Sequence, residues 1–319
     1  MGLTFRENET GAEAVVTGWT CDSENARSFH LGIPPAWQGR PVTAIASHAF
    51  ENHKGIKSIT LPDTIRRIGS YAFYNCTGLE KLTLTDSVES YDGGAIRECT
   101  SLAVIELHIK RGSYQILKDL IGDSGAELHV HIWLSAPGFE RFDTSNCLEQ
   151  VKFSNFPLAD PGKERSKSDI STCSGQAKVS TSESPEVDLI FPSYYDEFRE
   201  DTHARDFHYH IIGAGMGYRE VVTRRGIDLI DYDRKFETVT GMPGSFATAA
   251  RIAYGRLVWP YKLLPRRREQ YLTYLKDHSD ELLKMLTGRH EVEKAAKVME
   301  LLGTSTAAPE ENAFDLGDL

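Results

Sequence analysis

Histidines and carboxylates that could bind a metal ion lie close together between residues 201 and 210. Alternate residues of a strand face the same side, so His208 and His210 could contact one ion there, with Asp201, His203 and Asp206 nearby. The segment supplies no distant ligand that would close such a site. We therefore interpret it as a polar strand face and predict no metal. An enzymatic or metal-binding C-terminal domain built around residues 201–210 is the alternative.

A second set of polar residues occupies alternate positions in segments that we predict to be neighbouring strands of one sheet. An interval of 23 residues between these segments would place Glu106 beside His129 and His108 beside His131. Such a face is either a solvated surface, a partner-binding patch or a metal site. We predict that it binds a protein partner, through Lys81, Thr83, Glu106, His108, Glu127, His129 and His131.

Gly213 and Gly215 follow an apolar segment, as glycines do in loops that bind the pyrophosphate of a dinucleotide. The third glycine position of such a loop holds Tyr218, which is too large for close packing of a helix on a strand. We interpret the glycines as a structural turn and predict no cofactor. No G-x-S-x-G signature occurs in the chain either, so we assign no catalytic residue.

The elements that position these residues come from a repeat with a period of 23 residues. Three units begin at Val42, Ile65 and Val88, and seven of their columns are apolar in every unit. Fainter units precede and follow them, which gives about six coils. In the central unit, Leu82 and Leu84 alternate with polar residues and therefore face one side of a short strand. We expect both leucines to be fully enclosed by neighbouring coils. Val130 and Phe153 belong to fainter coils and should be less enclosed, unless the C-terminal domain docks on that end and caps it.

The unit that begins Ile68-Gly69-Ser-Tyr-Ala72-Phe73 and continues through Cys76, Leu79, Leu82 and Leu84 resembles the BspA-type leucine-rich repeat. The resemblance extends from about Ala12 to Ser154. It implies a solenoid whose strands stack into a parallel sheet. Members of the family are mostly large surface-exposed bacterial and protozoan proteins that bind other macromolecules, so the resemblance also implies an interaction protein.

The composition divides the chain into four parts, and the fold class that we predict is α+β. Residues 1–155 form the solenoid, 156–186 a Ser-rich flexible linker, 187–303 a mainly helical domain with strands at its start, and 304–319 an acidic tail. The spacing of apolar residues and the positions of helix-breaking proline and glycine predict four helices: Ile227–Val239, Ser245–Trp259, Pro265 to Gly288, and Glu291–Leu302.

Charge and cysteine content limit the function further. The net charge of −10 disfavours a nucleic-acid partner, and the chain contains no apolar run long enough to span a membrane and no secretory signal. We expect a cytoplasmic protein. Cys76 and Cys99 share a repeat column, so a disulfide is conceivable, but we expect reduced thiols that fill the core. The prediction as a whole is a non-enzymatic interaction protein.

Overall fold

The computed structural model describes residues 2–20, 28–134, 187–201, 206–289 and 291–303, with the backbone alone for residues 196–201 and 206–210. The linker, the acidic tail and Phe153 therefore lie outside the described residues. Among the helices of the described ranges, none has both the length and the apolar character needed to cross a membrane.

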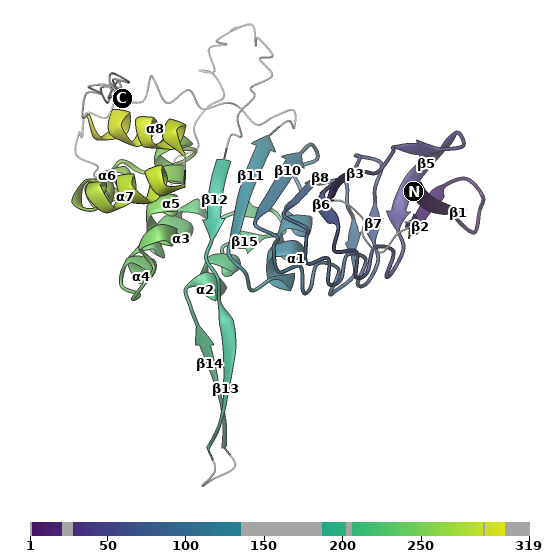
Figure 1. The fold of residues 1–319 in the computed structure, drawn as a ribbon, viewed down its shortest axis with the longest axis horizontal. Helices are drawn as coiled ribbons and strands as arrows, with labels where there is room; N and C mark the ends of the chain where they lie inside the picture. The colour runs from purple at the N-terminus through teal and green to yellow at the C-terminus, as the bar shows by residue number, and fades with distance from the viewer. Residues whose placement is uncertain (1, 21–27, 135–186, 202–205, 290, 304–319) are drawn as a thin grey trace, which may run out of the picture. The chain divides into compact units, whose positions relative to one another are not determined.

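The repeats build a solenoid with a sheet along each of two sides (Figure 1). The larger sheet contains parallel strands β3 (Phe29–Gly32), β6 (Ile56–Thr60), β8 (Lys81–Thr85), β10 (Val104–Ile109) and β11 (Leu128–Leu134). The second sheet contains six strands: β1 (Gly2–Glu7), β2 (Ala14–Thr20), β4 (Ala36–Trp37), β5 (Arg40–Ile45), β7 (Arg67–Ile68) and β9 (Ser90–Tyr91). The predicted parallel solenoid is confirmed.

The apolar columns fill the space between the two sheets. Leu82 and Leu84 are completely buried, as predicted. Val130, expected to be less enclosed, is also completely buried, because another strand follows β11 in the sheet. Cys76 and Cys99 are free thiols in the core, and each donates to a backbone carbonyl of the preceding coil.

The last described coil differs from the regular ones, and this changes the strand register. It contains helix α1 (Gln115–Asp123) in place of a tight turn, so Val104 pairs with His129 and Glu106 with His131. The prediction that Glu106 lies beside His129 and His108 beside His131 was therefore wrong. The interval of 23 residues fails here because the helical coil is two residues longer, and His108 instead pairs with Trp133.

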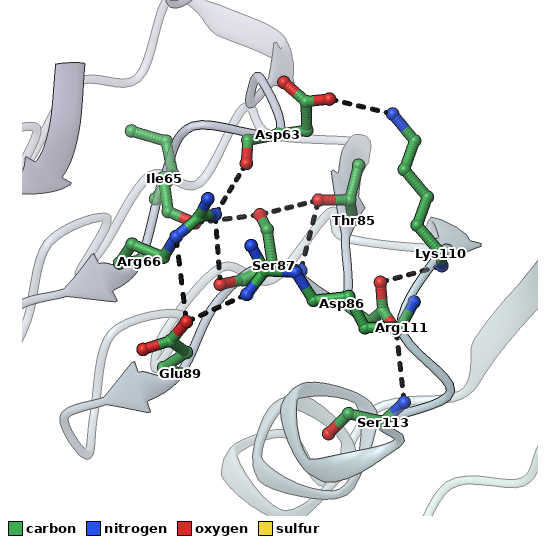
Figure 2. A network of polar contacts seen from close by, with 10 residues as sticks. All are labelled: Asp63, Ile65, Arg66, Thr85, Asp86, Ser87, Glu89, Lys110, Arg111 and Ser113. Carbon is green, nitrogen blue, oxygen red and sulfur yellow. Dashed lines mark hydrogen bonds and ion pairs between the residues drawn. The ribbon is translucent and has the colours of Figure 1, made fainter. Parts of the chain in front are cut away.

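A buried carboxylate holds the start of this helical coil in place (Figure 2). Asp86 accepts hydrogen bonds from the backbone amides of Lys110, Arg111 and Ser113, at 2.8, 2.7 and 3.1 Å. Ser87 beside it donates to the carbonyl of Ile65, at 2.8 Å. Three charge-assisted bonds to one carboxylate fix the backbone between β10 and α1.

After residue 186 the chain returns to the solenoid. Strand β12 (Val187–Phe191) pairs antiparallel with β11, and the solenoid and helical segments belong to one compact unit, Met1–Pro137 with Pro185–Leu319. Tyr232 covers the outer edge of β12, since its hydroxyl bonds both the amide and the carbonyl of Ile190, at 3.0 and 2.8 Å. An exposed sheet edge is thereby avoided.

A hairpin of β13 (Tyr195–Asp201) and β14 (Asp206–Ile212) comes next, and β14 leads through Gly213 into helix α2 (Gly215–Glu220). The predicted glycine turn is present. Gly213 has a φ of +102°, and a Cβ on Gly215 would lie 2.1 Å from the carbonyl oxygen of Pro192. Glycine is needed at both positions because the chain passes another backbone segment closely.

The rest of the described chain is mainly helical. Two short strands, β15 (Val222–Thr223) and β16 (Gly226–Ile227), precede α3 (Leu229–Arg234), α4 (Phe236–Thr240), α5 (Phe246–Val258), α6 (Pro265–Asp277), α7 (Ser279–Gly288) and α8 (Val292–Leu302). The single helix expected from Pro265 to Gly288 is two helices. His278, with φ −117° and ψ 22°, interrupts it, and two acidic residues favour a new start in the first turn of α7.

Candidate functional site

The outer face of the larger sheet carries the polar residues that the sequence singled out. One part of it, which we call the open face, consists of outward-facing side chains of β6, β8 and β10: Ser58, Thr60, Lys81, Thr83, Glu106 and His108. The other part, on β11 and β12, is covered by α5, α7 and α8. The seven predicted residues are thus divided between two different environments.

Cross-strand contacts hold the side chains of the open face. Glu106 accepts from Lys81 Nζ at 2.6 Å and from the Thr83 hydroxyl at 2.8 Å. Burial raises the pKa of Glu106, but these two hydrogen bonds and the Lys81 charge outweigh it, so the pKa lies below its usual value. Glu106 is therefore ionised at neutral pH.

An aromatic pair lies at the end of the open face. The ring of His108 stacks on that of Trp133, with centroids 4.7 Å apart and an interplanar angle of 14°. Burial lowers the pKa of His108, which keeps the imidazole uncharged at neutral pH. Trp133 is only partly buried, so the pair offers apolar contact area next to the charged Lys81–Glu106 pair.

A cavity of about 480 Å³ lies between the covered part of the sheet and the helices, and we call it the helix-covered cavity. Its sheet side is formed mainly by Glu127, His129, His131, Asp188 and Ile190. Its helical side contains both apolar and charged groups: Arg251, Tyr254, Trp259, Leu282, Met285, Leu286, Arg289, Glu291, Lys294 and Val298.

Two imidazoles converge on one buried carboxylate in this cavity. His129 and His131 lie two residues apart on β11, and Asp188 of β12 pairs with His131 in the antiparallel ladder. His129 Nε2 bonds Asp188 Oδ1, and His131 Nδ1 lies 3.4 Å from Asp188 Oδ2. Burial would raise the pKa of Asp188, but its contacts with the two histidines hold the pKa below its usual value. We call these three residues the His–Asp cluster.

Glu127, which the sequence placed in the same row, contacts the helices instead. Its carboxylate bonds the side chains of Arg251 and Thr248, both on α5. Gly255, one turn further along α5, allows the helix to pack closely on β12. A Cβ at this position would lie only 3.3 Å from the Asp188 carboxylate. Glu127 is therefore an anchor for α5 and is turned away from solvent.

The open face gathers Lys81, Thr83, Glu106 and His108, whereas Glu127, His129 and His131 lie in the helix-covered cavity. Sequence reasoning missed Trp133 and Asp188. Trp133 could have been found from the sequence, because it alternates with His129 and His131 along one strand and so faces the same side. Asp188 could have been found because it is the one charged residue in an otherwise apolar segment, VDLIF.

The alternative site at residues 201–210 lies largely outside the described residues. The side chains of Asp201, Asp206, His208 and His210, and the whole of His203, lie outside the described residues. The backbone pairs His208 with Arg199 and His210 with Glu197 in the β13–β14 hairpin. A metal-binding or enzymatic role for this segment stays a prediction.

Comparison with known families and structures concerns the repeats. Residues 39–119 match the BspA type leucine rich repeat region in six copies, which confirms the resemblance seen in the sequence. No curated protein matches the chain.

Three similar solved structures each cover 34% of this chain. They are a leucine-rich repeat protein of T. pallidum (23% identity, TM-score 0.29, 51% of that chain), a leucine-rich cell surface protein of Faecalibacterium prausnitzii (28%, 0.27, 31%) and a leucine-rich repeat protein of Bacteroides ovatus (26%, 0.28, 30%). The similarity thus spans about half or less of each of these proteins.

Proposed function

We propose that this chain, whose residues 39–119 are a BspA-type leucine-rich repeat region, is a non-enzymatic interaction protein that binds a protein partner on its open face. A cytoplasmic location remains part of the proposal. The observation that carries the proposal is the ordered set of side chains on the open face, where Glu106 bonds both Lys81 and Thr83 across neighbouring strands.

Order of this kind favours binding because association normally costs side-chain entropy. Immobilising one flexible side chain at an interface costs roughly 0.5–1.5 kcal/mol. On the open face, Lys81, Thr83 and Glu106 are already restrained by mutual bonds, and His108 by stacking on Trp133. Each repeat packs only on its neighbours, so the parallel strands present these groups at fixed spacings.

The chemistry of the face favours a protein as the partner. Lys81 and Glu106 supply one charge of each sign, and Trp133 adds an aromatic surface, which is enriched in protein interfaces. A nucleic acid would be repelled by the net charge of −10 and would find a single lysine on the open face. The partner that fits is a protein with a mixed-charge surface and an apolar contact for Trp133.

The test compares two ion pairs, one on the open face and one next to the second sheet. Lys81→Ala with Glu106→Ala removes the pair on the open face. Arg66→Ala with Glu89→Ala removes a pair, 3.7 Å apart, whose residues directly precede β7 and β9 of the second sheet. Both double variants leave the net charge unchanged. We expect pull-downs from cells that produce the protein to lose a specific partner with the first variant and to keep it with the second.

Thermal melts of both variants show whether each is folded. Retention of the same partners by a folded Lys81→Ala, Glu106→Ala variant would contradict the proposal. Loss of those partners with the folded Arg66→Ala, Glu89→Ala variant would equally contradict it, since the binding surface would then lie on the other sheet.

A further inference from the structure

We propose that the His–Asp cluster binds a Zn²⁺ ion in the helix-covered cavity, with His129, His131 and Asp188 as its ligands. The site is independent of partner binding on the open face. It arises from the antiparallel pairing of β12 with β11, which brings in Asp188 from a distant part of the chain.

The strand geometry places three ligands on one side of the sheet. Residues two apart on a strand face the same way, so His129 and His131 are neighbours on β11. Asp188 lies directly opposite His131 and diagonally from His129, which is within reach of long side chains. One potential ligand atom from each residue lies within 4.8 Å of the others.

The distance between two of the three ligand atoms fits a tetrahedral ion. With zinc–ligand bonds of about 2.0–2.1 Å, two tetrahedral ligand atoms are about 3.3–3.4 Å apart. His131 Nδ1 and Asp188 Oδ2 are 3.4 Å apart. His129, which now bonds Asp188 directly, must rotate to admit the ion, and its side chain is partly exposed. Its ring lies against that of His131, with centroids 4.1 Å apart.

An unsatisfied nitrogen points independently to a ligand. His131 Nδ1 is buried and forms no hydrogen bond with any described residue, because its contact with Asp188 is that of an ion pair. A buried nitrogen that lacks a hydrogen bond destabilises the fold, so its presence beside the Asp188 carboxylate calls for an explanation. A metal bond to this nitrogen supplies one.

The donor set selects the metal. Two imidazoles and one carboxylate suit Zn²⁺ and other late first-row ions, whereas Ca²⁺ and Mg²⁺ prefer oxygen ligands throughout. Asp188 is almost fully buried, and apolar Ile190, Leu282 and Leu286 line the same cavity. Exclusion of water strengthens the attraction between the carboxylate and a cation.

Three protein ligands leave a fourth position, and the site faces the cavity. Among the cations that line that cavity, Arg251 pairs with Glu127 and Lys294 pairs with Glu291, so a water suits the fourth position. The inference is a zinc site with one open position.

Calorimetric titration of the full, chelator-treated chain with ZnCl₂ tests the site. We expect one Zn²⁺ bound per chain, and at least a tenfold loss of affinity in His131→Ala and in Asp188→Asn. His108→Ala is the matched control, since it removes a histidine on the neighbouring strand of the same face and should leave the affinity unchanged.

A second control separates this site from the segment 201–210. The double variant His208→Ala, His210→Ala should bind zinc as the unmodified chain does. Loss of the zinc in that variant with retention in His131→Ala would overturn the proposal, as would less than a tenth of an equivalent bound by the unmodified chain. Visible absorption of the Co²⁺-loaded chain checks the geometry without relying on stability, and we expect a tetrahedral spectrum that is absent in His131→Ala.

Discussion

Arg219 joins the helical coil that contains α1 to the segment around β12 and α2, and its removal should destabilise the fold. The guanidinium donates to the carbonyls of Ile121, Ser124 and Ala126 on the solenoid side, at 2.7–3.1 Å. It also donates to the carbonyls of Pro192 and Gly215, at 2.6 and 3.0 Å. Arg219 is almost fully buried, so water cannot replace these bonds.

The expected cost follows from two opposing effects. Replacing Arg219 by Met removes six hydrogen bonds, and at about 1 kcal/mol each they contribute about 6 kcal/mol. The substitution also stabilises the folded state, because methionine carries no charge that must be buried. Burial lowers the pKa of Arg219 from 12.5 to about 10, which corresponds to about 3 kcal/mol at 1.36 kcal/mol for each pH unit. The net loss of stability should be about 3 kcal/mol.

Urea denaturation followed by circular dichroism and by tryptophan fluorescence measures this loss. Arg225→Met is the control, because Arg225 is exposed and its replacement should change stability by less than about 0.5 kcal/mol. Hydrogen exchange should also become faster in β12 and α2, which contain or adjoin the carbonyl partners of Arg219. A loss in Arg219→Met no larger than that in Arg225→Met would refute the reasoning that this side chain couples the two parts.

Three further predictions concern the solenoid. Leu82→Ala should lower the free energy of unfolding by about 2–5 kcal/mol, because removal of a completely buried side chain leaves a cavity. A loss below about 1 kcal/mol in urea denaturation would contradict this and would mean that the coil collapses into the cavity. Asp86→Ala should cost about 2–4 kcal/mol in the same assay, since three backbone amides lose their acceptor, whereas replacement of the exposed Glu98 should cost little. Burial raises the pKa of both Cys76 and Cys99 to about 12, so neither thiol should be alkylated by iodoacetamide at pH 8 in the native chain. Peptide mapping that finds either cysteine labelled as fast as in urea would contradict this prediction.

The sequence predicted the features that depend on local periodicity. Alternation at Leu82 and Leu84 specified a strand with one buried face, and glycines at 213 and 215 specified a turn that no other residue fits. Each of these follows from the residues themselves and from their immediate neighbours in the chain.

The features that the sequence did not predict depend on contacts between distant segments. Two additional residues in the helical coil shift β11 against β10, so that Glu106 meets His131. The pairing of β12 with β11 then brings Asp188 to the same place across a gap of 59 positions in the chain. Neither event leaves a periodic trace in the sequence. For this reason the sequence pattern grouped residues of the open face and of the helix-covered cavity into one candidate site.

The central claim is that the open face binds a protein, and site-specific photo-crosslinking tests it most directly. A photoreactive amino acid in place of Thr60, which is exposed on β6 beside Thr83, reports on the open face in cells that produce the protein. The same amino acid in place of Arg67, exposed on β7, reports on the second sheet. We predict a discrete crosslinked protein from position 60 that disappears when Lys81 and Glu106 are replaced by alanine. No crosslink from position 60, or the same crosslinked protein from position 67, would contradict the claim.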